Sequence, residues 1–98
     1  MYNTFTDFDD FENTIYGDKP VLIEFFEEWS QKHKELDIPE FILYYKCNVS
    51  EQDDIAEWCD ITDLPTFICF QNGVELFTLE GSNKVQLKKL IDNILPSE

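Results

Sequence analysis

Basic residues are scarce in this sequence. Only 7 of its 98 residues are lysine or arginine, against 21 aspartates and glutamates, which gives a formal net charge of -14 at pH 7. A chain this acidic repels the phosphates of nucleic acids and of anionic lipids. We therefore expect neither a nucleic-acid nor a membrane partner, and we interpret the acidity chiefly as a source of solubility.

Long apolar runs are also missing. No stretch approaches the roughly 18 consecutive apolar residues of a membrane-spanning helix, and the N-terminal region lacks the basic and then apolar layout of a signal peptide. The sequence thus predicts a soluble, cytoplasmic protein. Its 98 residues, 43% of them hydrophobic, suffice for one core, so we expect a single domain over residues 1–98.

Cysteine is the third scarce residue. Cys47, Cys59 and Cys69 are an odd number of thiols with neither metal-site nor redox-motif spacing. Cys47 and Cys69 fall in apolar strands, where a thiol reacts slowly, whereas Cys59 lies in a helix and is the candidate for a regulatory thiol. The sequence predicts no disulfide framework, no metal site and no cofactor.

What is present is an alternation of helix and strand patterns separated by short turns, which is typical of an α/β domain. Thr6 is the expected N-cap of the first helix, and Ser50 to Asp53 resemble a capping box before a later one. Asn72 and Gly73 predict a tight turn between two antiparallel strands. The predicted helices cover residues 7–16, 55–59 and 87–95, the last ended by Pro96, and the predicted strands cover 21–26, 41–47, 67–70 and 75–79.

Four segments carry a resemblance to a known family. They are 19–25 followed by Trp29, then 46–49, 64–67 and 70–73. In this order and spacing the chain resembles the thioredoxin family over nearly its whole length. The resemblance implies a thioredoxin-like fold, in which a central mixed β-sheet is flanked by helices.

The resemblance places the family's Cys-Gly-Pro-Cys motif at Ser30, Gln31, Lys32 and His33. Dithiol exchange needs a thiolate nucleophile and a second, resolving thiol, so it is not possible at these positions. We therefore predict a redox-inactive, thioredoxin-like protein-binding module rather than a dithiol reductase. The alternative is an oxidoreductase or redox-regulated protein that works through a lone thiol such as Cys59.

A binding groove is implied by further matches to the family. Pro65 matches the family's cis-proline, which presents a backbone edge to bound polypeptide, and Leu64 and Thr66 flank it. Trp29 matches the exposed tryptophan beside the motif. We expect these residues and His33 to bind a protein or peptide partner.

Glu24 matches the buried acid that assists proton transfer in catalytic members of the family, and Lys46 matches the lysine that faces it. With no cysteine to deprotonate, we interpret the two as a retained structural ion pair. A hydrolase that uses Ser30 and His33 with Glu24 is a weaker alternative, because Ser30 is the expected N-cap of a helix.

A metal site formed by His33 with Glu27 and Glu28 is not predicted, since one histidine among surface carboxylates is a common accident.

The helix that follows the motif in the family must be short here. Between His33 and Lys46, Pro39 and the predicted strand leave room for roughly two helical turns. Shortening this helix should bare apolar strand surface, and we expect a homodimer or a dedicated protein partner to cover it. The candidate residues for the bared face are Ile38, Phe41, Ile42, Leu43, Tyr44 and Tyr45.

Overall fold

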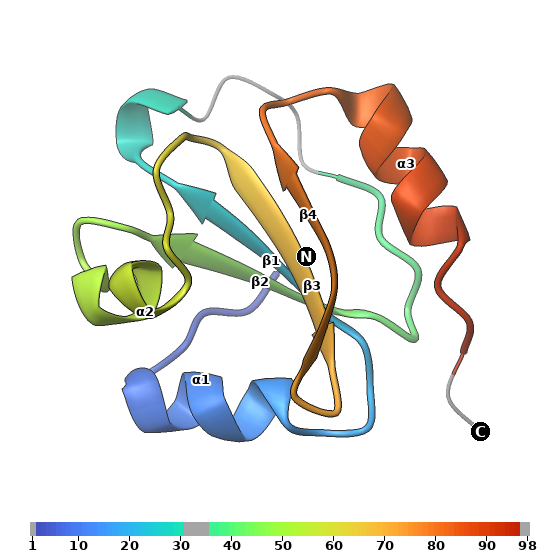
Figure 1. Cartoon of the computed structure of the whole chain (residues 1–98), viewed down its shortest axis with the longest axis horizontal. Coiled ribbons are helices and arrows are strands. Elements are labelled where there is room, and N and C mark those ends of the chain that lie inside the picture. Colours follow the sequence, from blue (N-terminus) through green and yellow to red (C-terminus); the bar gives the residue numbers. More distant parts are fainter. Residues whose placement is uncertain (1, 31–35, 97–98) are drawn as a thin grey trace.

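The computed structural model describes residues 2–30 and 36–96, which form a four-stranded sheet with helices on both faces (Figure 1). The elements in chain order are α1 (Phe8–Ile15), β1 (Val21–Phe26), the 3-10 helix η1 (Glu28–Ser30), β2 (Leu43–Asn48), α2 (Asp53–Trp58), β3 (Thr66–Gln71), β4 (Val74–Glu80) and α3 (Lys84–Asp92). None of the helices in these residues is long and apolar enough to cross a membrane.

The strands lie in the order β2-β1-β3-β4. β1 pairs with β2 in parallel and with β3 in antiparallel orientation, and β3 and β4 form an antiparallel hairpin. β1 is a central strand whose first five residues are buried, which explains its nearly continuous apolar sequence. The predicted α/β fold, a mixed sheet flanked by helices, is confirmed.

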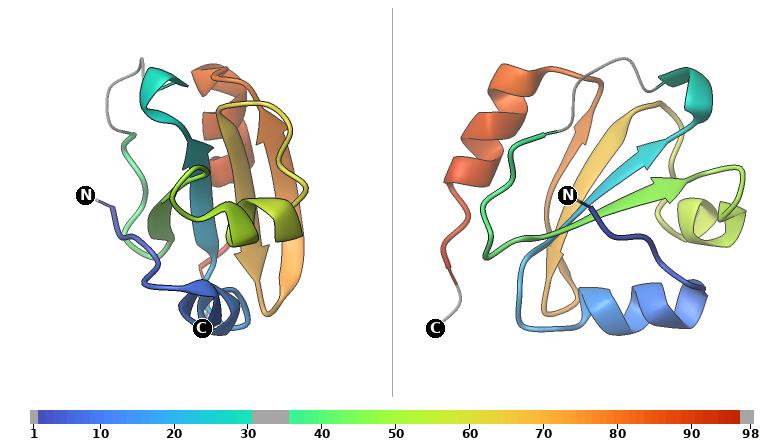
Figure 2. Two further views of the ribbon diagram at one scale, coloured as in Figure 1. Left: turned by 90° about the vertical axis from the view of Figure 1, so that its left-hand side faces the viewer. Right: turned by 180° about the vertical axis from the view of Figure 1, so that it is seen from behind.

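Side chains alternate between the two faces of the sheet along each strand. The helices α1 and α2 cover one face, and α3 covers the other together with the non-helical segment 36–41 (Figure 2). The core on the α1 and α2 face contains Phe5, Phe11, Ile15, Val21, Ile23, Phe25, Cys47, Ile55, Ile68 and Phe70. The core on the α3 face contains Leu22, Ile42, Tyr44, Phe67, Cys69, Leu79, Leu87 and Ile91.

The turn between β3 and β4 has the predicted conformation. Asn72 and Gly73 have φ angles of 54° and 76°, as a two-residue hairpin turn of the primed kind requires. A side chain at Gly73 would also collide with the ring of Tyr16, since a Cβ atom there would lie 2.3 Å from it. Both conditions explain why glycine stands at this position.

The helix caps differ from the prediction. The N-cap of α1 is Asp7 rather than Thr6, because the Asp7 carboxylate accepts a hydrogen bond from the N–H of Asp10. The cap of α3 is Asn83, which accepts from the N–H of Gln86. The helix ends at Asp92, four residues before the predicted stop at Pro96.

The predicted capping box at Ser50 to Asp53 is wrong. Gln52 is the N-cap of α2 and makes no side-chain cap. The hydroxyl of Ser50 instead donates to the carboxylate of Glu27, after β1, so it connects the ends of two neighbouring strands.

The region expected to hold a short second helix is partly outside the described residues. Residues 36–42 are not helical, and positions 33–35 are not described. The predicted bared apolar face is wrong, because none of the six candidates is exposed. Ile42 and Tyr44 are buried, while Ile38, Phe41, Leu43 and Tyr45 are half-buried. Instead the non-helical segment 36–41, which ends in a turn at 40–41, packs its own apolar side chains on the sheet.

Candidate functional site

The candidate site lies at the edge of the sheet where β1 ends and β3 begins. Phe25 is paired with Thr66 in the antiparallel register of these two strands. The residues that follow β1, including Trp29 and Ser30 in η1, are therefore placed at the same edge as Pro65, which precedes β3. This brings together the predicted binding residues that the structure describes.

The peptide bond between Leu64 and Pro65 is cis, as predicted. Pro65 is buried, and its carbonyl accepts a hydrogen bond of 2.8 Å from the N–H of Gly81, after β4. The hydroxyl of Thr66 is also buried and donates to the carbonyl of Asp63 at 2.5 Å. These bonds fix the backbone on both sides of the proline.

Leu64 is half-buried, and its backbone N–H and C=O make no hydrogen bond to any residue that the structure describes. An unpaired backbone edge next to a sheet can accept an extended peptide through main-chain hydrogen bonds. Leu64 is thus one position at this edge where, among the described residues, such pairing is available.

Trp29 and Ser30 are adjacent but differ sharply in exposure. The Trp29 side chain is 67% exposed, whereas Ser30 is 8% exposed. The Ser30 hydroxyl donates to the carbonyl of Glu27 and accepts from the N–H of Glu27, both at 2.8 Å. Trp29 therefore has a free aromatic surface, and the Ser30 hydroxyl is occupied within η1.

The three remaining motif positions, Gln31, Lys32 and His33, lie outside the described residues. The arrangement of Ser30, His33 and Glu24 therefore lies outside the described residues. The hydrolase alternative gains no support from Ser30, because its hydroxyl is bonded to the backbone of Glu27. Within residues 2–30 and 36–96, no group of three or more histidine, cysteine, aspartate or glutamate side chains has metal-site geometry.

Beneath this edge lies a buried carboxylate. Glu24 in β1 is fully buried, and its Oε1 accepts a hydrogen bond of 2.7 Å from the hydroxyl of Tyr44 in β2. Lys46 is the register partner of Glu24 across the parallel β1–β2 pair, so both side chains project on the same face. The ion pair between them stays a prediction.

The Lys46 ammonium also lies over two aromatic rings. Its Nζ is 4.8 Å from the ring centroid of Tyr2 and 5.7 Å from that of Phe26, which places it in cation–π range of both. Tyr2 packs edge-on against Tyr44, and the neighbouring Asn3 bridges to the outer side of β2. The N-terminal segment thus covers the lysine.

Sequence reasoning did not include Tyr44 in this group. The signal was available, because Tyr44 precedes Lys46 by two residues in a strand and therefore shares its face.

The three cysteines are free thiols. Burial raises the pKa of Cys47, of Cys69 and of the half-buried Cys59, in each case to about 12. At Cys59 smaller contributions come from Cys47, Glu75 and Asp60. Since the thiolate is the reactive form, these values count against Cys59 as a redox-active or regulatory thiol.

Comparison with known proteins gives a consistent result. The family model described as Thioredoxin matches residues 3–93. The chain is 33% identical over 93 residues to a thioredoxin of Echinococcus granulosus, with 87% of each chain covered. Its structure resembles the crystal structure of a Malassezia sympodialis thioredoxin, with a TM-score of 0.81, 27% identity, and 94% and 89% of the two chains covered. A Plasmodium falciparum thioredoxin structure gives a TM-score of 0.79 at 26% identity, covering 95% and 99%.

Proposed function

Because the chain belongs to the thioredoxin family and carries Ser30 and His33 where the family's thiols are expected, we propose that it is a redox-inactive protein-binding module. The observation that carries this proposal is a cis-proline edge with no cysteine pair at positions 30–33. The cis bond before Pro65 and the exposed Trp29 are both present, while the chemistry that would act on a bound disulfide has no thiol to perform it.

The proposed binding mode follows from the Leu64 backbone N–H and C=O, which make no hydrogen bond to any described residue. A partner segment in extended conformation pairs with the Leu64 N–H and C=O, in the manner of strand addition to a sheet edge. Trp29 supplies an aromatic contact beside it, and such exposed tryptophans are frequent hot spots of binding. His33, next to Trp29 in the motif, belongs to the same proposed surface.

In this proposal Glu24 and Lys46 have a structural role. A buried acid near a redox-active thiol exchanges protons with it, but no cysteine occupies positions 30–33. The bond from Tyr44 instead uses the Glu24 carboxylate to join β1 to β2.

The first test is a disulfide-reduction assay with insulin as substrate. Wild type is compared with a variant in which Ser30→Cys, Gln31→Gly, Lys32→Pro and His33→Cys restore the family motif. We expect an inert wild type and an active variant, because the scaffold retains the edge at Pro65. Reduction by the wild type would overturn the proposal, and loss of that activity on Cys59→Ala would assign it to the lone thiol instead.

The second test concerns binding itself. Peptides selected from a random library against the wild type should lose about tenfold or more in affinity for Trp29→Ala, since hot-spot tryptophans typically contribute this much. Trp58→Phe is the control, because Trp58 in α2 is also exposed but belongs to another surface, and phenylalanine keeps an aromatic ring against Phe11. Equal affinity for the wild type and Trp29→Ala would place binding elsewhere.

We also propose a cytoplasmic location, which the three free thiols support, since unpaired cysteines are typical of reducing compartments. Imaging of the tagged chain in its own cell tests this. Self-association is a separate proposal, and sedimentation equilibrium over a range of concentrations distinguishes a homodimer from a monomer that binds other proteins.

A further inference from the structure

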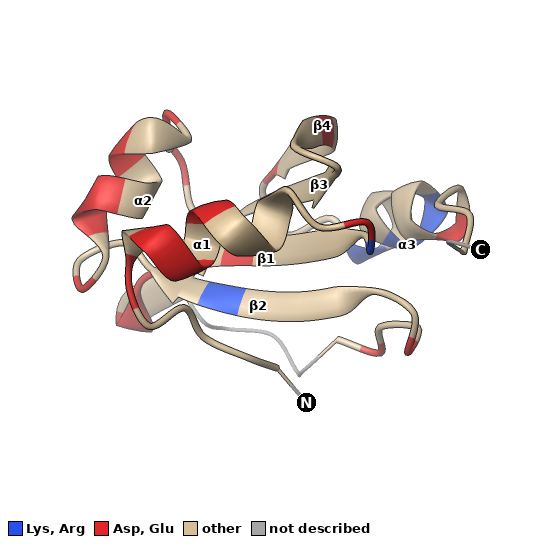
Figure 3. Ribbon diagram, turned by 90° about the horizontal axis from the view of Figure 1, so that it is seen from below, with Lys and Arg blue, Asp and Glu red and all other residues tan. Residues whose placement is uncertain are grey.

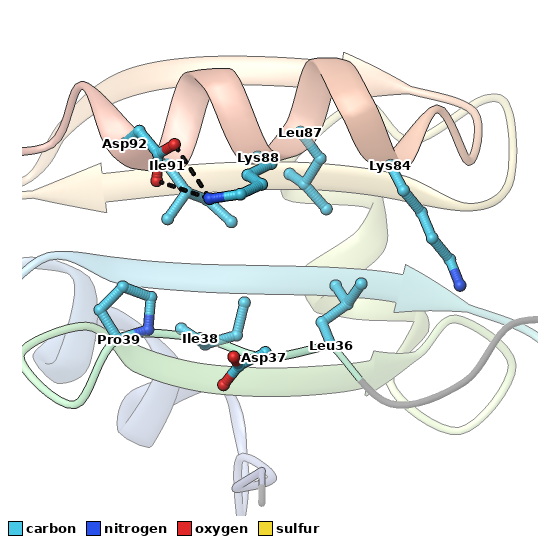
Figure 4. Close-up of a pocket in the computed structure, with 9 residues that line it drawn as sticks. All are labelled: Leu36, Asp37, Ile38, Pro39, Lys84, Leu87, Lys88, Ile91 and Asp92. Carbon is cyan, nitrogen blue, oxygen red and sulfur yellow. Dashed lines mark hydrogen bonds and ion pairs between the residues drawn. The ribbon is translucent and has the colours of Figure 1, made fainter.

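A groove separates α3 from the extended segment 36–39 on one face of the molecule (Figure 4). Its volume is about 360 Å³, at the lower end of the range of small-molecule sites. The apolar side chains in its walls are Leu36, Ile38 and Pro39 on one side and Leu87 and Ile91 on the other. An extended chain is narrower than a helix, so the segment 36–39 leaves this space open beside α3.

The charged residues at the groove are arranged unevenly. Lys88 is paired with Asp92, with 3.1 Å between Nζ and Oδ2, whereas Lys84 has no ion pair or hydrogen bond to any described residue. The spacing along α3 is i, i+3 and i+7 for Lys84, Leu87 and Ile91. The Lys84 ammonium therefore lies at one end of an apolar stripe. Asp37 lies on the opposite wall, and in Figure 4 its carboxylate points away from Lys84.

The surroundings of the groove differ from the rest of this acidic chain. α3 carries three lysines, Lys84, Lys88 and Lys89, and one acid, Asp92, while α1 and α2 carry only acidic charges (Figure 3). At physiological salt charges beyond about 8 Å are largely screened, so the distant acids repel a bound anion weakly. Within the groove itself Lys88 is paired with Asp92 and the Asp37 carboxylate points away from Lys84, so the Lys84 end is where a single negative group fits best.

We propose that this groove binds a free small carboxylic acid with a linear apolar chain, of the medium-chain fatty-acid class. The apolar chain lies between Ile38 and the Leu87 and Ile91 side chains, and the carboxylate pairs with the Lys84 ammonium. The rise from Lys84 to Ile91 is about 10 Å along the helix axis, close to the length of an extended chain of about eight carbons. This site is distinct from the edge at Pro65 and does not depend on the proposed peptide binding.

The test is a titration of the whole chain with octanoate, followed by amide chemical shifts and calorimetry below the micellar concentration. The largest shifts are expected in 36–39 and in α3. Affinity should rise about fourfold for each methylene added from hexanoate to octanoate, as burial of a methylene group predicts. Shifts confined to other elements, or no dependence on chain length, would overturn the proposal.

Two matched comparisons test the role of charge. Lys84→Ala should weaken octanoate binding about fivefold, the upper range for an exposed ion pair, whereas Lys89→Ala, on the same helix but outside the groove, should leave it unchanged. Octanol, which lacks the carboxylate, should bind the wild type more weakly than octanoate and should not distinguish Lys84→Ala. Circular dichroism confirms that each variant is folded, and equal effects of the two lysine variants would contradict the assignment.

Discussion

The two faces of the sheet are covered in different ways. On one face α1 and α2 pack over a dense aromatic cluster, in which Phe11 is fully buried with the rings of Phe5, Phe8 and Trp58 within 5.5 Å of its own. On the other face the cover is α3 together with the non-helical segment 36–41, and a groove remains between α3 and residues 36–39. The second face also contains the buried carboxylate of Glu24.

The two faces therefore contribute differently to the stability of the fold and to the binding of ligands. An apolar core packed on all sides stabilises a fold strongly and leaves no room for a ligand. The face under α3 contains the buried acid Glu24, the covered lysine Lys46 and an open groove. It therefore contributes less packing but offers specific contacts. The four predictions below compare the two faces with each other, or the folded chain with the unfolded chain.

The largest expected effect is in the aromatic cluster. Phe11→Ala should lower the free energy of unfolding by about 3–5 kcal/mol, because it removes a fully buried ring and leaves a cavity. Phe41→Ala makes the same chemical change at a half-buried position on the α3 face and should cost less than about half as much. Urea unfolding of both variants measures the difference, and equal losses would mean that the two faces are equally well packed.

Much of this architecture follows from the sequence. The apolar run of β1 and the Asn72–Gly73 turn are local patterns with one dominant structural solution. The cis-proline was predicted only through the resemblance to the family, because a single proline does not reveal its isomer. The elements and the site edge were therefore predictable from local pattern and family likeness together.

The features that sequence reasoning missed depend on tertiary contacts or on a choice between neighbouring residues with similar propensities. Thr6 and Asp7 are neighbouring residues that both cap helices well, so their pattern does not decide between them. The non-helical course of 36–41 is set by packing on the sheet rather than by local propensity. The bond between Tyr44 and Glu24 requires the β1–β2 register, which no local pattern supplies.

The second prediction concerns the thiols on the two faces. With a pKa of about 12, Cys47, Cys59 and Cys69 should react with iodoacetamide at pH 8 about a thousandfold more slowly in the folded than in the urea-unfolded chain. Mass spectrometry of each labelled site measures the rates. Fast labelling of Cys59 in the folded protein would restore the lone-thiol alternative.

The same pKa values predict a loss of stability in alkali. Between the pKa of the unfolded thiol, about 8.5, and the folded value near 12, the folded chain holds more protons. Its stability must then fall as the pH rises, because unfolding releases protons from the thiols. Urea unfolding at pH 8 and pH 10 tests this, with the triple cysteine-to-alanine variant as the control, whose stability should fall less.

The smallest of these effects tests the buried carboxylate. Tyr44→Phe removes the hydroxyl that donates to Glu24 and should cost about 1.5–3 kcal/mol, as for hydrogen bonds to charged groups. Tyr45→Phe is the control on the other face, where the ring stacks on Phe5 and no described residue bonds its hydroxyl, so the change should stay within about 0.5 kcal/mol. The urea midpoints give both values, provided that the slope of the unfolding free energy against urea concentration is the same for each variant. Equal small losses would mean that other contacts satisfy Glu24, and the hydroxyl of Tyr44 would then have no part in joining β1 to β2.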